Sequence, residues 1–224
     1  GSLSLISKAI HSRRFGFCSL HLHLLDPERF PLAKIALKNG MGVMAISPAD
    51  KGGHLHSPSQ TLIEDCDPFS PIELAYRFLL AQKISTLTLG ASKPKDLRLA
   101  KKLSSSNGPL NELERASILR LRENTKKRLG ETYCGQCQEC LPCPNKVPIP
   151  NLLRLRNLSV GHDLYTFSKE RYNLINRAGH WWETIDASAC NQCGDCLPRC
   201  PLHLPIPDLL KDTHHRLIDI PSRR

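Results

Sequence analysis

Two stretches of this sequence are nearly the same: CGQCQECLPCPNKVPIPNLL at residues 134–153 and CNQCGDCLPRCPLHLPIPDLL at residues 190–210. The first three cysteines of the two copies match at one constant offset, which pairs Cys134 with Cys190. From the fourth cysteine onward the offset is longer by one, because the second copy carries an extra residue, Arg199. The two stretches therefore form an internal repeat, in which the fourth cysteine is a separable part of each motif.

Three kinds of site compete for these cysteines. Disulfides suit a secreted domain, and cysteines three apart in a row point too nearly the same way to pair with one another. Structural zinc usually uses two CxxC pairs that are about 15 to 20 residues apart. Here the four cysteines of each copy fall within ten or eleven residues. The second copy reads CxxCxxCxxxCP, which is a spacing that binds four-iron four-sulfur ([4Fe–4S]) clusters. The repeat thus predicts two such clusters.

In that spacing the fourth cysteine ligates the other cluster. The same rule applied to this chain predicts crossed ligation, which would tie the two copies together. The two expected sets of ligands are Cys134, Cys137, Cys140 and Cys200 for the first cluster, and Cys190, Cys193, Cys196 and Cys143 for the second.

After each fourth cysteine the PIP motif predicts the start of a helix at its second proline, because proline is well tolerated in a first helical turn. We expect these helices to cap the clusters with Ile149, Leu152, Leu153, Ile206, Leu209 and Leu210. Between the copies, Trp181 and Trp182 either shield a cluster from water or pack as ordinary large aromatic residues.

The first hundred residues alternate between strand and helix patterns. Strands are expected within 15–25, 41–47 and 85–90, and helices within 27–40, within 71–82 and after Pro94. Such alternation predicts parallel strands covered by helices, either a doubly wound sheet or part of a barrel. Residues 109–131 then predict one long helix, with acidic residues at its start and basic residues at its end.

Composition sets further limits. The 224 residues are 40% hydrophobic and carry a formal charge of +10, but the basic residues are spread along the chain. We therefore expect no nucleic-acid partner. No stretch approaches the roughly 20 apolar residues that span a bilayer, so we expect a soluble, cytoplasmic protein. Residues 1–17 fit an amphipathic helix, or alternatively an organelle transit peptide.

Three segments, GMGVMAISPADKGG (40–53), PIELAYRFLLAQ (71–82) and TLTLGASKPKDL (86–97), resemble the later part of an aldo/keto reductase barrel. Joined to the cysteine repeat, the whole chain resembles the ferredoxin-bearing aldo/keto reductases. The resemblance implies a partial TIM barrel of α/β class, formed by the last three βα units, followed by a mainly α-helical ferredoxin-like domain. The implied boundaries are 1–107 for the barrel part, 108–131 for a linking helix and 132–224 for the cluster domain.

The resemblance also implies that NADP(H) binds in the loops after two of the strands. The residues that fall on these loops are Ser47, Pro48, Ala49, Lys51 and Gly52 after one strand, and Gly90, Ala91, Ser92, Lys93 and Lys95 after the next. The catalytic Asp, Tyr, Lys and His set of that family would lie upstream of residue 1, so no catalytic residue is assigned in this chain. The implied partners are a redox partner protein or a small-molecule carbonyl substrate.

Some histidines and cysteines outside the repeat carry weaker signals. His21 and His23 lie on one face of the first strand, where they either bind a metal or form hydrogen bonds in the interior. Cys18 and Cys66 are expected to be free thiols.

The predicted function is that of an NADPH-linked aldo/keto reductase-type oxidoreductase coupled to two [4Fe–4S] clusters. The alternatives are a non-enzymatic iron–sulfur electron carrier and a zinc-stabilised interaction domain.

Overall fold

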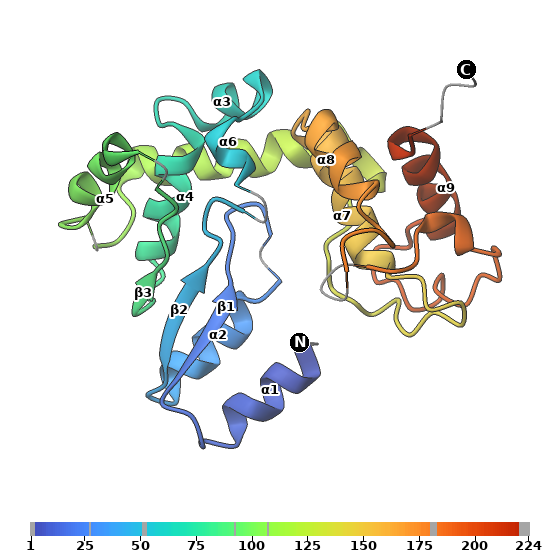
Figure 1. Ribbon diagram of the computed structural model, residues 1–224, viewed down its shortest axis with the longest axis horizontal. Coiled ribbons are helices and arrows are strands. Elements are labelled where there is room, and N and C mark those ends of the chain that lie inside the picture. The colour runs from blue at the N-terminus through green and yellow to red at the C-terminus, as the bar shows by residue number, and fades with distance from the viewer. Residues whose placement is uncertain are drawn as a thin grey trace. The chain divides into compact units, whose positions relative to one another are not determined.

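The computed structural model describes residues 3–26, 28–50, 53–91, 93–106, 108–179 and 183–219, and Figure 1 shows the order of their elements. By its internal contacts the chain divides into two compact units. Unit 1 holds Gly1–Pro58 and Leu62–Leu121, and unit 2 holds Ser59–Thr61 and Arg122–Arg224. The cysteine repeat lies entirely in unit 2.

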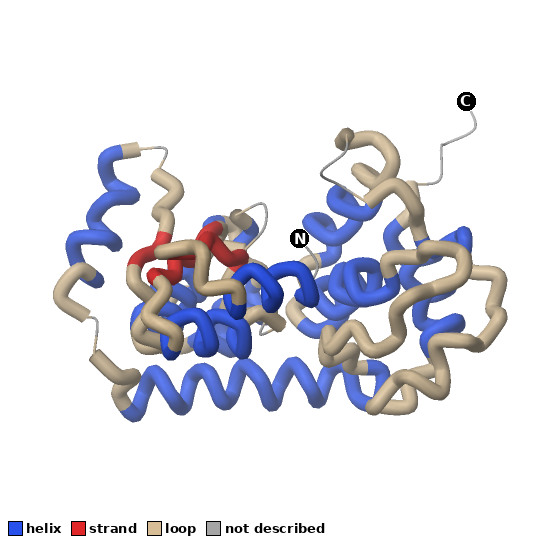
Figure 2. The backbone as a smooth tube through the Cα atoms, turned by 90° about the horizontal axis from the view of Figure 1, so that it is seen from below, coloured by secondary structure: helices blue, strands red, loops and turns tan. Residues whose placement is uncertain are grey.

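Unit 1 is built on a parallel sheet in the order β1 (Phe17–His21), β2 (Gly42–Ile46) and β3 (Thr86–Leu87). Phe17 lies beside Gly42 in the register of β1 and β2, and Met44 lies beside Thr86 in that of β2 and β3. Figure 2 shows these strands, in red, close together in one part of the molecule. The parallel arrangement and the three strand positions agree with the sequence pattern.

The helices that lie wholly or mostly in unit 1 are α1 (Leu3–His11), α2 (Phe30–Lys38), α3 (Gln60–Cys66), α4 (Pro71–Leu80) and α5 (Leu97–Leu103), with short 3₁₀ turns η1 (His54–His56) and η2 (Pro94–Asp96). The amphipathic pattern of residues 3–11 is confirmed as helix, whereas α3 lies where we expected only loop. Helix α4 begins as its sequence predicts, because Pro71 occupies the first turn and the Ser70 hydroxyl accepts a hydrogen bond from the Glu73 backbone amide.

The core of unit 1 joins the sheet to the helices around it. Leu20 and Val43 on the strands are buried together with Leu74 and Leu79 of α4. The rings of Phe30 on α2 and Phe78 on α4 meet edge to face, with their centroids 5.2 Å apart. Burial of these side chains is the main stabilisation of the unit.

The expected fold class is wrong. A TIM barrel is a closed ring of eight strands, but the described residues form a single three-stranded sheet whose third strand, β3, is very short. In the described part of unit 2 there are helices and loops and no strand, so its likeness to a ferredoxin is one of cysteine spacing and not of fold. The chain is a small α/β fold with nine α-helices among its described residues.

Helix α6 (Glu112–Leu129) follows within the range predicted for a long helix. Its start is capped reciprocally: Asn111 Oδ1 accepts from the Glu114 amide at 2.8 Å, and Glu114 Oε2 accepts from the Asn111 amide at 2.9 Å. The short turn η3 (Gly130–Thr132) follows its last residue.

The remaining helices of unit 2 are α7 (Ile149–Gly161), α8 (Tyr165–Tyr172) and α9 (Ile206–Leu217), with the turn η4 (Ala187–Ala189) before the second cysteine run. Helices α7 and α9 both begin one residue before the predicted proline. The two helices begin at equivalent positions because the PIP motif is repeated.

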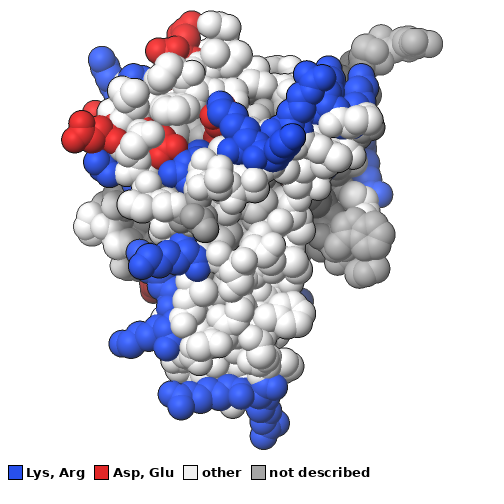
Figure 3. Space-filling model, turned by 90° about the vertical axis from the view of Figure 1, so that its left-hand side faces the viewer, with Lys and Arg blue, Asp and Glu red and all other residues white. Residues whose placement is uncertain are grey.

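Charge and hydropathy complete the description of the fold. On the face drawn in Figure 3, Lys and Arg side chains lie at several separate places. Within the described ranges, no helix combines the length and the apolar character needed to cross a bilayer.

Candidate metal centre

The two cysteine loops have the same backbone conformation. Left-handed residues occur in matching pairs, at Gln136 and Gln192 (φ 59° and 60°) and at Gln138 and Gly194 (φ 66° and 82°). A third pair, Lys146 and His203 (φ 56° and 51°), follows the fourth cysteine of each copy. The third pair is offset by one position more than the first two, so the backbone repeats with the same step as the sequence.

The backbone hydrogen bonds of the loops repeat in the same way. The Leu141 amide donates to Gln138 O at 3.0 Å, and its counterpart Leu197 donates to Gly194 O at 2.9 Å. In each copy a further bond closes the turn after the fourth cysteine, from Lys146 N to Cys143 O and from His203 N to Cys200 O. These turns wind the chain tightly around its cysteines.

One thiol of the first copy, Cys134, is influenced by a cysteine of the second copy. Burial raises the pKa of the Cys134 thiol, and the nearby thiols of Cys137 and Cys200 raise it further. Burial, Cys134 and Cys137 likewise raise the pKa of Cys140 to about 12. Cys200 therefore lies within electrostatic reach of Cys134, although the two belong to different copies and are far apart in the sequence.

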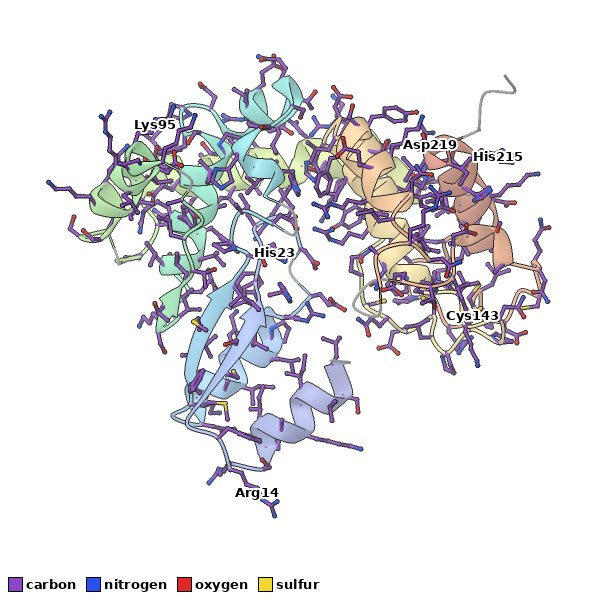
Figure 4. The ribbon with its side chains drawn as sticks, in the orientation of Figure 1. Arg14, His23, Lys95, Cys143, His215 and Asp219 are labelled. Atoms are coloured by element: carbon purple, nitrogen blue, oxygen red, sulfur yellow. The ribbon has the colours of Figure 1, made fainter. Side chains whose placement is uncertain are left out.

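The second copy mirrors this arrangement. Burial raises the pKa of the Cys196 thiol, and the thiols of Cys190, Cys193 and Cys143 add to the effect. The same four cysteines line one hollow of the surface, together with Ile149, Leu210 and Arg199. In Figure 4, Cys143 lies among the loops below α7 and α9. The hollow thus gathers the four cysteines of the predicted second set, while in the predicted first set Cys200 acts on the pKa of Cys134.

Burial of the first three cysteines follows the same order in both copies, whereas the fourth is half-buried in the first copy (Cys143) and buried in the second (Cys200). Cys140, Cys196 and Cys200 are buried with 7% exposure each, whereas Cys137 and Cys193 are exposed. The side chains expected to cap the clusters are all buried in the same core as these three thiols: Ile149, Leu152, Leu153, Ile206, Leu209 and Leu210. Trp181 and Trp182 lie outside the described residues.

Polar side chains fix the loops from outside. Asn157 of α7 donates to Cys134 O at 2.8 Å and accepts from its amide at 3.4 Å. Gln136 Nε2 lies 3.3 Å from Cys134 Sγ as a hydrogen-bond donor. Asn145 donates to Ala189 O at 2.9 Å, next to Cys190. Sequence spacing alone did not single out these three residues, although each lies in or beside the repeat.

The donor set suits a [4Fe–4S] cluster in three respects. All ten cysteines are free thiols, so the eight of the repeat are available as ligands. Each set of four combines three cysteines of one loop with one from the other. The raised pKa values show that the buried thiols resist ionisation without a cation, and a bound metal reverses that preference. Among the described residues, no group of three or more His, Cys, Asp or Glu side chains is arranged to hold a metal ion.

Five of the residues predicted to bind NADP(H) follow β2 and β3 of the sheet in unit 1. Ser47, Pro48 and Ala49 follow β2, and Gly90 and Ala91 come shortly after β3. Because β2 and β3 are parallel, their carboxyl ends share an edge. Lys93 and Lys95 are exposed at η2, and Figure 4 labels Lys95. Lys51, Gly52 and Ser92 lie outside the described residues.

A buried polar cluster lies where β1 ends and was not predicted as a set. Asp50 is 3.6 Å from His54 Nε2 and 3.9 Å from His23 Nε2, and the three residues are at most 5% exposed. The rings of His21 and His23 are 5.9 Å apart. Cys18 and Cys66 are free thiols, and burial raises the pKa of Cys66 to about 12. Only His23 had been named from the sequence, because Asp50 and His54 lie in a stretch that was expected to be loop.

Comparisons with family models, curated proteins and solved structures gave no significant match to this chain.

Proposed function

We propose that this chain binds two [4Fe–4S] clusters and relays single electrons between redox partners. One cluster would be held by Cys134, Cys137, Cys140 and Cys200, and the other by Cys190, Cys193, Cys196 and Cys143. The observation that carries the proposal is the hollow in which Cys143 of the first copy lies with Cys190, Cys193 and Cys196 of the second.

A [4Fe–4S] cluster accepts and releases one electron at a time, at a potential set by its net charge, hydrogen bonds and exposure. The chain would contribute each of these influences. Gln136 donates a hydrogen bond to Cys134 Sγ, and the leucine and isoleucine side chains of α7 and α9 keep water from the buried thiols. Such shielding makes a potential more negative, whereas hydrogen bonds to sulfur raise it.

The positions of the cysteines also support a relay. Cys140 and Cys196 belong to different predicted sets and are both buried, and Cys196 adds to the raised pKa of Cys140. Cys137 and Cys193 are exposed, one in each set. A protein partner would therefore reach either cluster at an exposed cysteine, while the two clusters would face each other in the core. Ten free thiols suit a reducing compartment, and we propose the cytoplasm.

The test is electron paramagnetic resonance of the full chain, reconstituted with iron and sulfide without oxygen and then reduced with dithionite. We expect a complex signal from two magnetically interacting reduced clusters. In Cys137→Ala or Cys193→Ala, which each remove one exposed ligand, the interaction should disappear and one simple signal should remain. A wild-type protein that gives no such signal after reconstitution contradicts the proposal.

A second candidate function is binding of NADP(H) at the sheet edge of unit 1, as part of the oxidoreductase predicted above. It is supported by the placement of Ser47–Ala49 and Gly90–Ala91 after neighbouring parallel strands, since backbone amides at such edges bind phosphate. NADPH fluorescence should change on titration with the protein. The double substitution of Lys93 and Lys95 by Ala should weaken binding about tenfold, and Lys101→Ala on α5 is the matched control. Equal affinity of all three proteins would argue against this candidate.

A further inference from the structure

Arg199 is the residue that makes the two copies unequal. The acidic position before the third cysteine is present in both copies: Glu139 in the first copy matches Asp195 in the second, at the same offset that pairs Cys134 with Cys190. Nothing in the first copy stands in the place of Arg199, because the second copy is one residue longer at that point. The loop of the second copy therefore carries one positive charge that the first lacks.

The guanidinium group of Arg199 is fixed between the copies. Its Nε donates to Asp195 O at 2.9 Å, within its own loop. Its terminal Nη2 donates to Pro142 O at 2.9 Å, and Pro142 directly precedes Cys143 in the other copy. The side chain is half-buried and lines the hollow that also contains Cys143, Cys190, Cys193 and Cys196. These contacts distinguish it from a freely solvated surface arginine.

The two contacts have different physical consequences. The bridge to Pro142 holds the segment that delivers Cys143 to the second set of cysteines. The charge acts on that set as well, because a guanidinium group stays protonated at all ordinary pH values. Adding an electron to a cluster makes the site more negative, and a nearby fixed cation stabilises this state.

We propose that Arg199 is a positioning residue that makes the two cluster sites inequivalent: it clamps Cys143 to the second site and raises the reduction potential of that site alone. This inference rests on the proposed binding of two clusters. Electrons entering at the first site would therefore settle on the second.

The test uses the full chain with one intact site at a time. Cys137→Ala leaves the second site intact, and Cys193→Ala leaves the first. In each background we would measure iron content and then the midpoint potential by redox titration with electron paramagnetic resonance. Arg199→Gln should lower the potential in the Cys137→Ala background, with a roughly tenfold change in the one-electron equilibrium constant, or about 59 mV. In the Cys193→Ala background the potential should stay the same.

Two further variants separate charge from clamping. Arg199→Lys keeps the charge but not the two-pronged contact, so it should retain most of the potential while the second cluster is lost several-fold faster in air. Lys34→Gln removes an exposed charge in unit 1 and should change neither property. An unchanged potential in Arg199→Gln at unchanged iron content, or an equal shift in both backgrounds, would overturn the inference. Absence of iron from the wild-type chain would instead refute the proposed function itself.

Discussion

The side chain of Asn157 forms hydrogen bonds with both backbone groups of Cys134. Its Nδ2 donates to the Cys134 carbonyl at 2.8 Å, and its Oδ1 accepts from the Cys134 amide at 3.4 Å. The contact joins α7 to the first cysteine of the repeat. Asn157→Ala leaves both backbone groups without this partner and should destabilise the chain by about 1 to 2 kcal/mol. It should also speed the loss of the first cluster in air, as followed by visible absorption. Asn151→Ala, which removes only an exposed hydrogen bond to Glu183 from the same helix, is the control.

Crossed ligation and ligation within one copy predict opposite results when one of the fourth cysteines is removed. In Cys200→Ser, the cysteines exposed to alkylation should be Cys134, Cys137 and Cys140, although Cys190, Cys193 and Cys196 lie nearer in the sequence. Cys143→Ser should give the opposite pattern. Mass spectrometry after iodoacetamide treatment without oxygen measures both. Preferential labelling of Cys190, Cys193 and Cys196 in Cys200→Ser would show that ligation is not crossed.

The buried ion pair of Arg77 and Glu114 should stabilise unit 1. Arg77 Nε donates to Glu114 Oε1 at 2.6 Å and Nη2 donates to Oε2 at 3.0 Å, and the two side chains are only 8% and 5% exposed. Glu114→Gln should lower the free energy of unfolding by roughly 3 kcal/mol, because it leaves a buried guanidinium group without its counter-ion. Glu73→Gln on α4 breaks an ion pair with the exposed Lys102 and should cost less than about 1 kcal/mol. Urea unfolding followed by circular dichroism measures both.

The same carboxylate gives the stability of unit 1 a pH dependence. Burial alone would raise the pKa of Glu114, but hydrogen bonds from Arg77 and from the Asn111 amide hold it below the ordinary value of 4.5. The folded state therefore binds the proton less readily than the unfolded state does. The stabilisation should be complete above about pH 4.5 and disappear as the pH falls through the lower folded pKa. The difference in the free energy of unfolding between wild type and Glu114→Gln should shrink as the pH falls through that range. A difference that grows there would contradict the assignment.

Gly161 at the end of α7 allows close packing against α6. A Cβ atom there would lie 2.8 Å from Leu129 Cδ1 and 3.1 Å from Thr125 Cγ2, and both of these side chains are buried. Gly161→Ala should therefore destabilise unit 2 by about 1 to 3 kcal/mol through overpacking. Gly135→Ala meets only an ordinary contact at 3.5 Å, with Leu202, and serves as the control. Equal denaturation midpoints of the two variants would show that α6 and α7 are not packed so tightly.

The sequence identified the elements that depend on local signals. The repeated PIP motif located the starts of α7 and α9 within one residue, since proline in the first turn acts locally. The alternation of patterns located β1, β2 and β3, and their parallel pairing followed from it. The cysteine spacing predicted two crossed sets of four thiols; the four of the second set line one hollow, and the ligation itself stays a prediction.

The rest depends on contacts between distant residues. The expectation of a partial TIM barrel was wrong: the described residues form one three-stranded sheet, in which β3 pairs with β2 only through Thr86 and Leu87. Helix α3 was missed because Pro, Ser and Asp flank a short apolar segment there. Arg199 contacts Pro142 in the other copy, and Asp50 lies close to His23 and His54. No periodic pattern in the sequence signals these contacts.

The central claim is that the repeat holds two [4Fe–4S] clusters, and metal analysis tests it most directly. Iron, acid-labile sulfide and zinc should be measured per chain, on protein purified without oxygen. The account predicts about eight irons and about eight sulfides, with little zinc. About one or two zinc ions per chain with no sulfide would contradict it, and would identify the repeat as a structural zinc module.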